Sequence, residues 1–141
     1  MPVFLLDANV LIALAWTQHH AHKLVGHWFQ RHSRSGWATC PFTESAFVRI
    51  SSNPAFSARA LVPRDAIALL KKNLELPNHE FWPANIGFLD AIRASEHRLT
   101  GHRQTTDAYL LGLAIQRGGK LATLDSGIAA WGPSNAVEWV R

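Results

Sequence analysis

Four acidic residues stand where one expected element of the chain gives way to the next. Asp7 follows a short buried run at residues 3–6, and Asp125 follows another at residues 120–124. Glu44 and Asp107 each fall in the first turn of an expected helix. In a parallel sheet the ends of the strands and the starts of the following helices open on one edge, where ligands bind. The spacing therefore predicts that these four carboxylates lie together.

Neighbouring carboxylates raise each other's pKa, because two like charges close together disfavour ionisation. A divalent cation relieves this repulsion, and oxygen ligands without Cys or His select a hard ion such as Mg²⁺ or Mn²⁺. Such an ion can bind a phosphodiester and lower the pKa of a bound water. No His or Lys stands out as a general base, which is consistent with a metal-bound water in that role. The acids thus indicate metal-dependent phosphodiester hydrolysis.

Each acid also has a simpler explanation. Asp is a favoured residue at a helix N-cap, so Asp7 could serve only to begin the helix that follows. Glu44 and Asp107 suit the positive end of a helix dipole. A cap and a metal ligand are compatible roles for one carboxylate, so these explanations stay open beside the metal site.

Short apolar runs alternate with longer amphipathic segments along the whole chain, which favours a mostly parallel sheet with helices on both faces. The expected strands cover residues 3–6, 37–40, 80–83, 120–124 and 137–140, the last at a sheet edge. The expected helices cover residues 8–16, 20–32, 43–50, 63–74, 88–93 and 105–115. Thr43 is expected to cap the third helix, and Thr105 or Thr106 the last. No linker or repeat divides the chain, so residues 1–141 are expected to form a single α/β domain.

Composition limits the classes of protein that this chain can belong to. With 141 residues and 48% hydrophobic residues, it can bury a real core and is not disordered. The single cysteine, Cys40, excludes an internal disulfide framework and suits a reducing compartment. No apolar run approaches the ~20 residues that span a bilayer, and no signal peptide is recognised. We therefore expect a cytoplasmic protein with no membrane partner.

The net charge of +4 favours an anionic partner such as nucleic acid. Ten of the 14 basic residues are Arg, which suits bidentate contact with phosphate. Without the four site acids, only six acidic residues remain against these 14 cations, so the surface outside the site is more basic than the net charge suggests. The candidates for contact with such a nucleic acid are Arg49, Arg98, His102 and Arg103.

The sequence resembles the PIN-domain ribonucleases, and specifically the VapC toxins of type II toxin–antitoxin modules. The motifs that carry the resemblance lie at residues 6–12 (Leu-Asp-Ala-Asn-Val-Leu-Ile), 43–49, 106–110 and 123–125, in the family's order. The resemblance implies a three-layer α/β/α PIN-like fold. It also implies a Mg²⁺- or Mn²⁺-dependent endoribonuclease that leaves 5′-phosphate and 3′-hydroxyl ends. Its implied partners are an RNA substrate, a VapB-type antitoxin and a second copy of the chain in a homodimer.

The resemblance also assigns roles to individual residues. Asp7, Glu44 and Asp107 match the metal-binding core, and Asp125 matches the fourth, more variable acid. Neighbouring polar residues expected to support the acids are Asn9, Thr106 and Thr123. One departure is Ile128, which stands where many relatives carry an aromatic residue.

Two other classes of function remain possible from the sequence. A non-catalytic domain could keep this fold and only bind RNA or protein, although loss of one or more acids would then be expected. A receiver or phosphohydrolase domain also gathers acids and Mg²⁺ at strand ends. A phosphohydrolase needs a second Asp two residues after the first, where this chain has Asn9, and a receiver needs a late Lys, where residues 123–125 are Thr-Leu-Asp.

Overall fold

The central sheet has five strands, all parallel, in the order β3-β2-β1-β4-β5. The computed structural model describes residues 1–141. The strands are β1 (Phe4–Leu6), β2 (Trp37–Thr39), β3 (His79–Phe81), β4 (Lys120–Thr123) and β5 (Val137–Trp139). Strand β1 is central and pairs with β2 on one side and β4 on the other. The predicted parallel sheet is confirmed, with β5 at an edge as expected.

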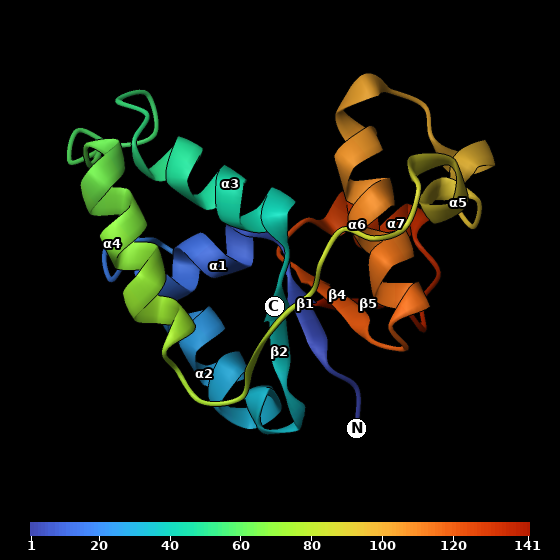
Figure 1. Cartoon of the computed structure of the whole chain (residues 1–141), viewed down its shortest axis with the longest axis horizontal. Coiled ribbons are helices and arrows are strands. Elements are labelled where there is room, and N and C mark those ends of the chain that lie inside the picture. Colours follow the sequence, from blue (N-terminus) through green and yellow to red (C-terminus); the bar gives the residue numbers. More distant parts are fainter.

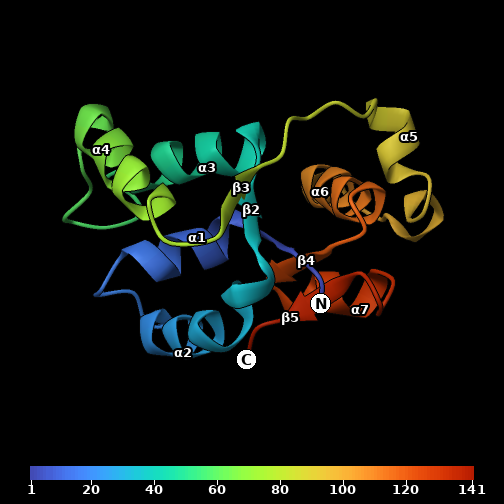
Figure 2. The ribbon, with the colours of Figure 1, turned by 60° about the horizontal axis from the view of Figure 1, so that its bottom comes forward.

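Helices cover both faces of the sheet, so the molecule has three layers (Figure 1). The helices are α1 (Ala8–Ala15), α2 (His22–His32), α3 (Pro41–Ser51), α4 (Pro63–Leu74), α5 (Phe88–Ile92), α6 (Thr105–Gln116) and α7 (Ser126–Trp131). Helices α1–α4 lie on one side of the strands and α5–α7 on the other, as Figure 2 also shows. The predicted three-layer α/β/α fold is confirmed. None of the helices is long and apolar enough to cross a membrane.

Alternate residues of the strands feed two separate cores, because successive side chains of a strand point to opposite faces. Phe4 and Leu6 join the core beneath α1–α4, which contains Trp28 and Trp37. Leu5 joins the second core, which α6 dominates. With side chains buried on both faces, these strands read as continuous apolar runs in the sequence, which made them recognisable.

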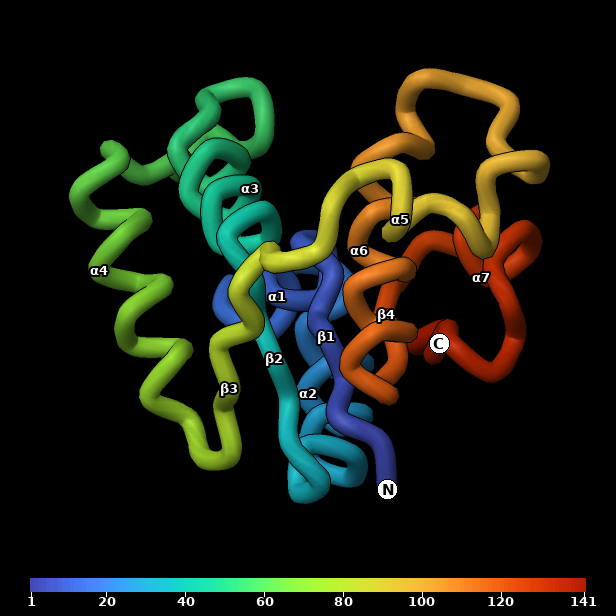
Figure 3. The backbone as a smooth tube through the Cα atoms, turned by 45° about the vertical axis from the view of Figure 1, so that its right-hand side comes forward, coloured from blue at the N-terminus to red at the C-terminus, as the bar shows by residue number.

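The order of the strands reverses beside β1. The chain proceeds from β1 to β2 and β3 on one side, and returns through α5 and α6 to β4 and β5 on the other. This reversal is a topological switch point, where the loops leaving two neighbouring strands diverge and leave room for a ligand. In Figure 3, α3 and α6 flank the carboxyl ends of β1 and β2. The acids that follow β1 and β4 thus lie beside each other.

The N-caps of two helices differ from expectation. Helix α3 begins at Pro41 with Cys40 as its N-cap, because Pro suits the first helical position. Thr43 is the third residue of the helix, and its hydroxyl oxygen accepts a hydrogen bond from the Cys40 N–H (3.0 Å). Helix α6 begins at Thr105 after Gln104, with no side-chain cap. The predictions of Thr43 as one N-cap and of Thr105 or Thr106 as the other were therefore wrong.

Helix α7 was not expected from the sequence. Asp125 is its N-cap, and its side chain accepts a hydrogen bond from the Gly127 N–H (2.7 Å). A six-residue helix that contains a glycine has little intrinsic propensity, so burial of Ile128 in the second core stabilises it. Between α5 and α6, the cation-rich segment forms two 3₁₀ turns, Glu96–Arg98 and His102–Gln104.

Candidate active site

Asp7 lies at the end of β1 and is buried, with 7% of its surface exposed. Two donors hold its carboxylate: the Ala8 N–H reaches Oδ1 (2.8 Å), and the Thr123 hydroxyl reaches Oδ2 (2.8 Å). Burial raises the pKa of Asp7, the two hydrogen bonds lower it, and the charge of Asp125 raises it further, so that the net shift is upward. Asp7 also caps α1, so the simpler explanation holds as well.

Thr123 is the centre of a hydrogen-bond network that joins β4 to the start of α1. Its hydroxyl oxygen accepts from the Asp125 N–H (3.0 Å) and from the Asn9 side-chain amide (3.5 Å) while its proton goes to Asp7. The Leu124 N–H donates to Asn9 Oδ1 (3.2 Å). Asn9 and Thr123 therefore connect the two strand ends that carry Asp7 and Asp125.

Asp107 lies in the first turn of α6, on the other side of the strand ends, and it is half-buried. No hydrogen bond to its side chain is present. Burial, followed by the charges of Asp7 and Asp125, raises its pKa from 3.8 to about 7. Asp107 is therefore close enough to Asp7 and Asp125 for their charges to act on it.

Glu44 is held on the α3 side of the strand ends. It lies in the first turn of α3, and its Oε2 accepts a short hydrogen bond from the Thr39 hydroxyl (2.6 Å). Thr39 Oγ1 also lies 2.7 Å from His79 Nε2. Burial lowers the pKa of His79, and the nearby Glu44 and Glu80 carboxylates oppose that shift.

Thr39 and His79 were missed from the sequence. Thr39 was placed at the end of a strand, where its alternation with Trp37 could have indicated the face on which it lies. His79 fell between an expected turn and an expected strand. Nothing in the local pattern of residues showed that β2 and β3 would bring the two side chains together.

The donor chemistry of the site fits a hard divalent cation. All four acids offer oxygen only, and the raised pKa of Asp7 and Asp107 reflects in part a repulsion that a cation would relieve. As the side chains stand, no three Asp, Glu, His or Cys groups converge on one point closely enough to form a ready-made metal site. Engaging one ion through three or more of them therefore requires their side chains to move toward each other.

The expected RNA-contact residues are all exposed. Arg98, His102 and Arg103 belong to the two 3₁₀ turns before α6, and Arg49 lies in the last turn of α3. Arg98 donates to the Trp131 carbonyl at the end of α7 (3.0 Å). The group is thus divided between the two helices that flank the acids.

Thr106 makes no hydrogen bond to any of the four acids. It is exposed and lines an apolar pocket of about 330 Å³, together with Phe42, Phe88 and Tyr109. The Tyr109 hydroxyl donates to the Ile86 carbonyl (2.8 Å). Thr106 thus faces a pocket that none of the four acids lines, and its supporting role stays a prediction.

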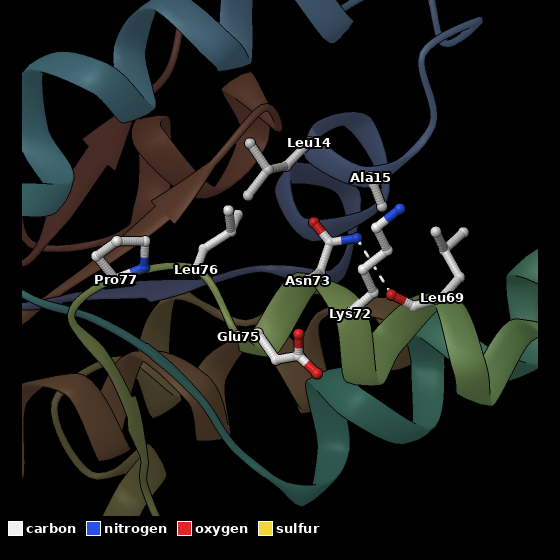
Figure 4. Close-up of a pocket in the computed structure, with 8 residues that line it drawn as sticks. All are labelled: Leu14, Ala15, Leu69, Lys72, Asn73, Glu75, Leu76 and Pro77. Atoms are coloured by element: carbon white, nitrogen blue, oxygen red, sulfur yellow. Dashed lines mark hydrogen bonds between the residues drawn. The ribbon is translucent and has the colours of Figure 1, made fainter.

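A separate pocket of about 450 Å³ lies between the end of α1 and α4 (Figure 4). Leu14 and Leu76 contribute apolar walls, and the Asn73 amide donates to the Leu69 carbonyl across its floor (3.3 Å). None of the four acids lines this pocket. The candidate site is therefore the carboxyl edge of the sheet.

Comparison with known proteins finds one matching family over most of the chain. The model of the PIN domain family matches residues 4–131. Ribonuclease VapC39 of Mycobacterium tuberculosis (strain ATCC 25618 / H37Rv) is 40% identical over 134 residues, which cover 95% of this chain and 96% of that protein. Ribonuclease VapC29 of the same strain is 43% identical over 125 residues, covering 89% and 87%.

A solved structure also matches the fold. It is VapBC2 from Rickettsia felis, bound to a DNA fragment from the promoter, and it aligns with a TM-score of 0.68 over 99% of each chain at 11% sequence identity. At that identity, the likeness concerns the fold alone. With the family match over most of the chain and relatives near 40% identity, this chain belongs to the PIN-domain family and, within it, to the VapC proteins.

Proposed function

We propose that this protein is a metal-dependent endoribonuclease and the toxin of a type II toxin–antitoxin module. The observation that carries the proposal is the group of three aspartates at the switch point, where burial and then the charges of Asp7 and Asp125 raise the pKa of Asp107 to about 7. Relatives that share the whole domain are named ribonucleases, which supports RNA as the substrate. The exposed cations on both flanks suit a phosphate backbone.

In this proposal, Asp7, Asp107, Asp125 and Glu44 hold Mg²⁺ or Mn²⁺. When bound, the ion lowers the pKa of a water ligand and stabilises charge at the scissile phosphate. Asn9 and Thr123 hold Asp7 and Asp125 in fixed positions relative to each other. Thr106 borders the site. Hydrolysis of the bond between phosphorus and the 3′-oxygen would leave 5′-phosphate and 3′-hydroxyl ends. Arg49, Arg98, His102 and Arg103 bind the RNA backbone.

The proposal extends to partners. A VapB-type antitoxin is supported by the VapC relatives. A homodimer follows from the resemblance to VapC toxins. The single cysteine is free and buried, which suits action in the reducing cytoplasm.

The test is cleavage of total RNA by the purified full-length protein. With Mn²⁺ we expect new 5′-phosphate ends, detected by ligation-dependent sequencing, and none in excess EDTA. Asp7→Asn keeps a capping side chain but should lower cleavage by at least about 10³-fold, since loss of a group acting at the reacting centre costs on that order. Full cleavage in EDTA or by Asp7→Asn would refute the proposal. RNA binding without cleavage by the wild type would favour a non-catalytic binding domain.

A further inference from the structure

A chain of two hydrogen bonds runs from His79 through Thr39 to Glu44, and the proposed function does not account for it. We propose that His79 is a positioning residue that acts through Thr39 to fix the Glu44 carboxylate at the edge of the site. The inference rests on the proposed function, because that function gives Glu44 its part in the site. The distances are 2.7 Å from His79 Nε2 to Thr39 Oγ1 and 2.6 Å from Thr39 Oγ1 to Glu44 Oε2.

The sheet itself brings these side chains together. Strands β2 and β3 run side by side (Figure 3), with Trp37 opposite His79 and Thr39 two residues further on. Trp37, Thr39 and His79 therefore lie on one face of the sheet. The Trp37 ring, which is fully buried, lies 4.7 Å from the His79 ring, centroid to centroid. The His79 ring is thus held by packing as well as by its hydrogen bond.

The number of available protons fixes which group donates and which accepts in each of these two hydrogen bonds. The Thr39 hydroxyl carries one proton but has two hydrogen-bonding neighbours. An ionised carboxylate only accepts, so Thr39 donates to Glu44 and His79 donates its Nε2–H to Thr39. Thr39 has no exposed surface, so water does not compete for its hydroxyl. The arrangement therefore selects the His79 tautomer that is protonated at Nε2.

The two carboxylate oxygens of Glu44 therefore differ in their hydrogen-bond partners. Oε2 is fixed by Thr39, whereas Oε1 has no hydrogen-bond partner in the protein. A Glu side chain has several rotamers, and fixing one oxygen removes part of the entropy that would otherwise be lost on binding. Partners that orient ligating groups in this way commonly change metal affinity by about 10–100-fold when removed.

The test is Mn²⁺ binding by calorimetry to the full-length protein. Thr39→Val removes the hydroxyl and His79→Phe removes the donor, and each should weaken Mn²⁺ binding by about 10–100-fold. Thr39→Ser and His79→Gln keep a donor at the same place and should restore most of the affinity. His22→Phe is the matched control, since His22 is half-buried and bonded to the Ala13 carbonyl (2.8 Å). Unchanged affinity in both Thr39→Val and His79→Phe would overturn the inference.

A second measurement needs no metal. In the metal-free protein, ¹⁵N NMR should find the His79 proton on Nε2, and Thr39→Val should release the ring to a mixture of tautomers. The Glu44 carboxyl ¹³C resonance should move in Thr39→Val and His79→Phe but not in His22→Phe. If the wild type binds no Mn²⁺, the proposed function fails, and this measurement still decides the inference. A wild-type His79 protonated on Nδ1 alone would overturn it.

Discussion

The two sides of the candidate site hold their acids in different ways. Asp7 and Asp125 follow neighbouring strands, and the Thr123 hydroxyl connects them while two donors satisfy the Asp7 carboxylate. Asp107 comes from a helix on the opposite face, and its carboxylate accepts no hydrogen bond within the protein. Burial and the charges of the other two aspartates disfavour ionisation of the Asp107 carboxyl group. Strand register thus fixes one side of the site, whereas helix packing alone places the other.

Among changes that leave all four acids in place, the largest effect is expected from loss of the Thr123 hydroxyl, which organises the strand side. Thr123→Val removes the donor to Asp7 and the acceptor for the Asp125 N–H. We expect RNA cleavage to fall by about 10–100-fold, as is common for a partner that orients a ligating group. Thr123→Ser keeps the hydroxyl and should recover most of the activity in the same assay. Equal cleavage by Thr123→Val and wild type would mean that the strand side does not depend on this network.

The helix side should be more sensitive to packing. A Cβ at Gly112, in the middle of α6, would clash with the Ala91 carbonyl oxygen of α5. Gly112→Ala forces the two helices apart and should cost about 1–3 kcal/mol of unfolding free energy, measured by urea denaturation. Gly26→Ala in α2 is the control, because nothing lies within 4 Å of a Cβ there. That change should stabilise the helix by about 0.5–1 kcal/mol. Equal effects of the two changes would contradict the proposed close contact.

The pH dependence of stability tests the electrostatic difference between Asp107 and the strand side of the site. Folding raises the pKa of Asp107 from 3.8 to about 7, so the folded protein keeps a proton that the unfolded chain releases. In EDTA, stability from this group should therefore fall as the pH rises through that interval. At about pH 8, Asp107→Asn should melt a few degrees above wild type, and at about pH 4 the two should agree. Because Asp107 is only half-buried, solvent screening keeps the effect small. Identical melting temperatures at both pH values would contradict the raised pKa.

The smallest effect is expected from the exposed cations beside α6. Arg103→Ala should weaken binding of a single-stranded RNA severalfold and reduce the salt dependence of log K by about 0.7, the value for one phosphate contact. Arg34→Ala removes the same charge from the turn before β2, at the opposite edge of the sheet. Fluorescence anisotropy across a range of salt concentrations measures both variants. The same loss in Arg34→Ala would indicate a general charge effect rather than a contact at the site.

Much of the fold was predictable because local patterns carried it. The buried strands appeared as apolar runs, and their alternation with helices predicted a parallel sheet. Helix α7 was not predictable, since tertiary burial of Ile128 stabilises a segment with weak local preference. The start of α3 was misplaced because Thr43 looks like a cap, while its hydroxyl instead bonds the Cys40 N–H from inside the helix.

The sequence by itself determined the positions of four acids at the ends of strands and the starts of helices, and hence their common edge. Only the tertiary structure decided how each carboxylate is held. Asp7 and Asp125 share Thr123, Asp107 is placed by the packing of α6, and Glu44 turns to Thr39 and His79. The reason is that strand and helix periods are local, whereas a hydrogen bond between β1 and β4, or between β2 and β3, depends on the register of strands far apart in the chain.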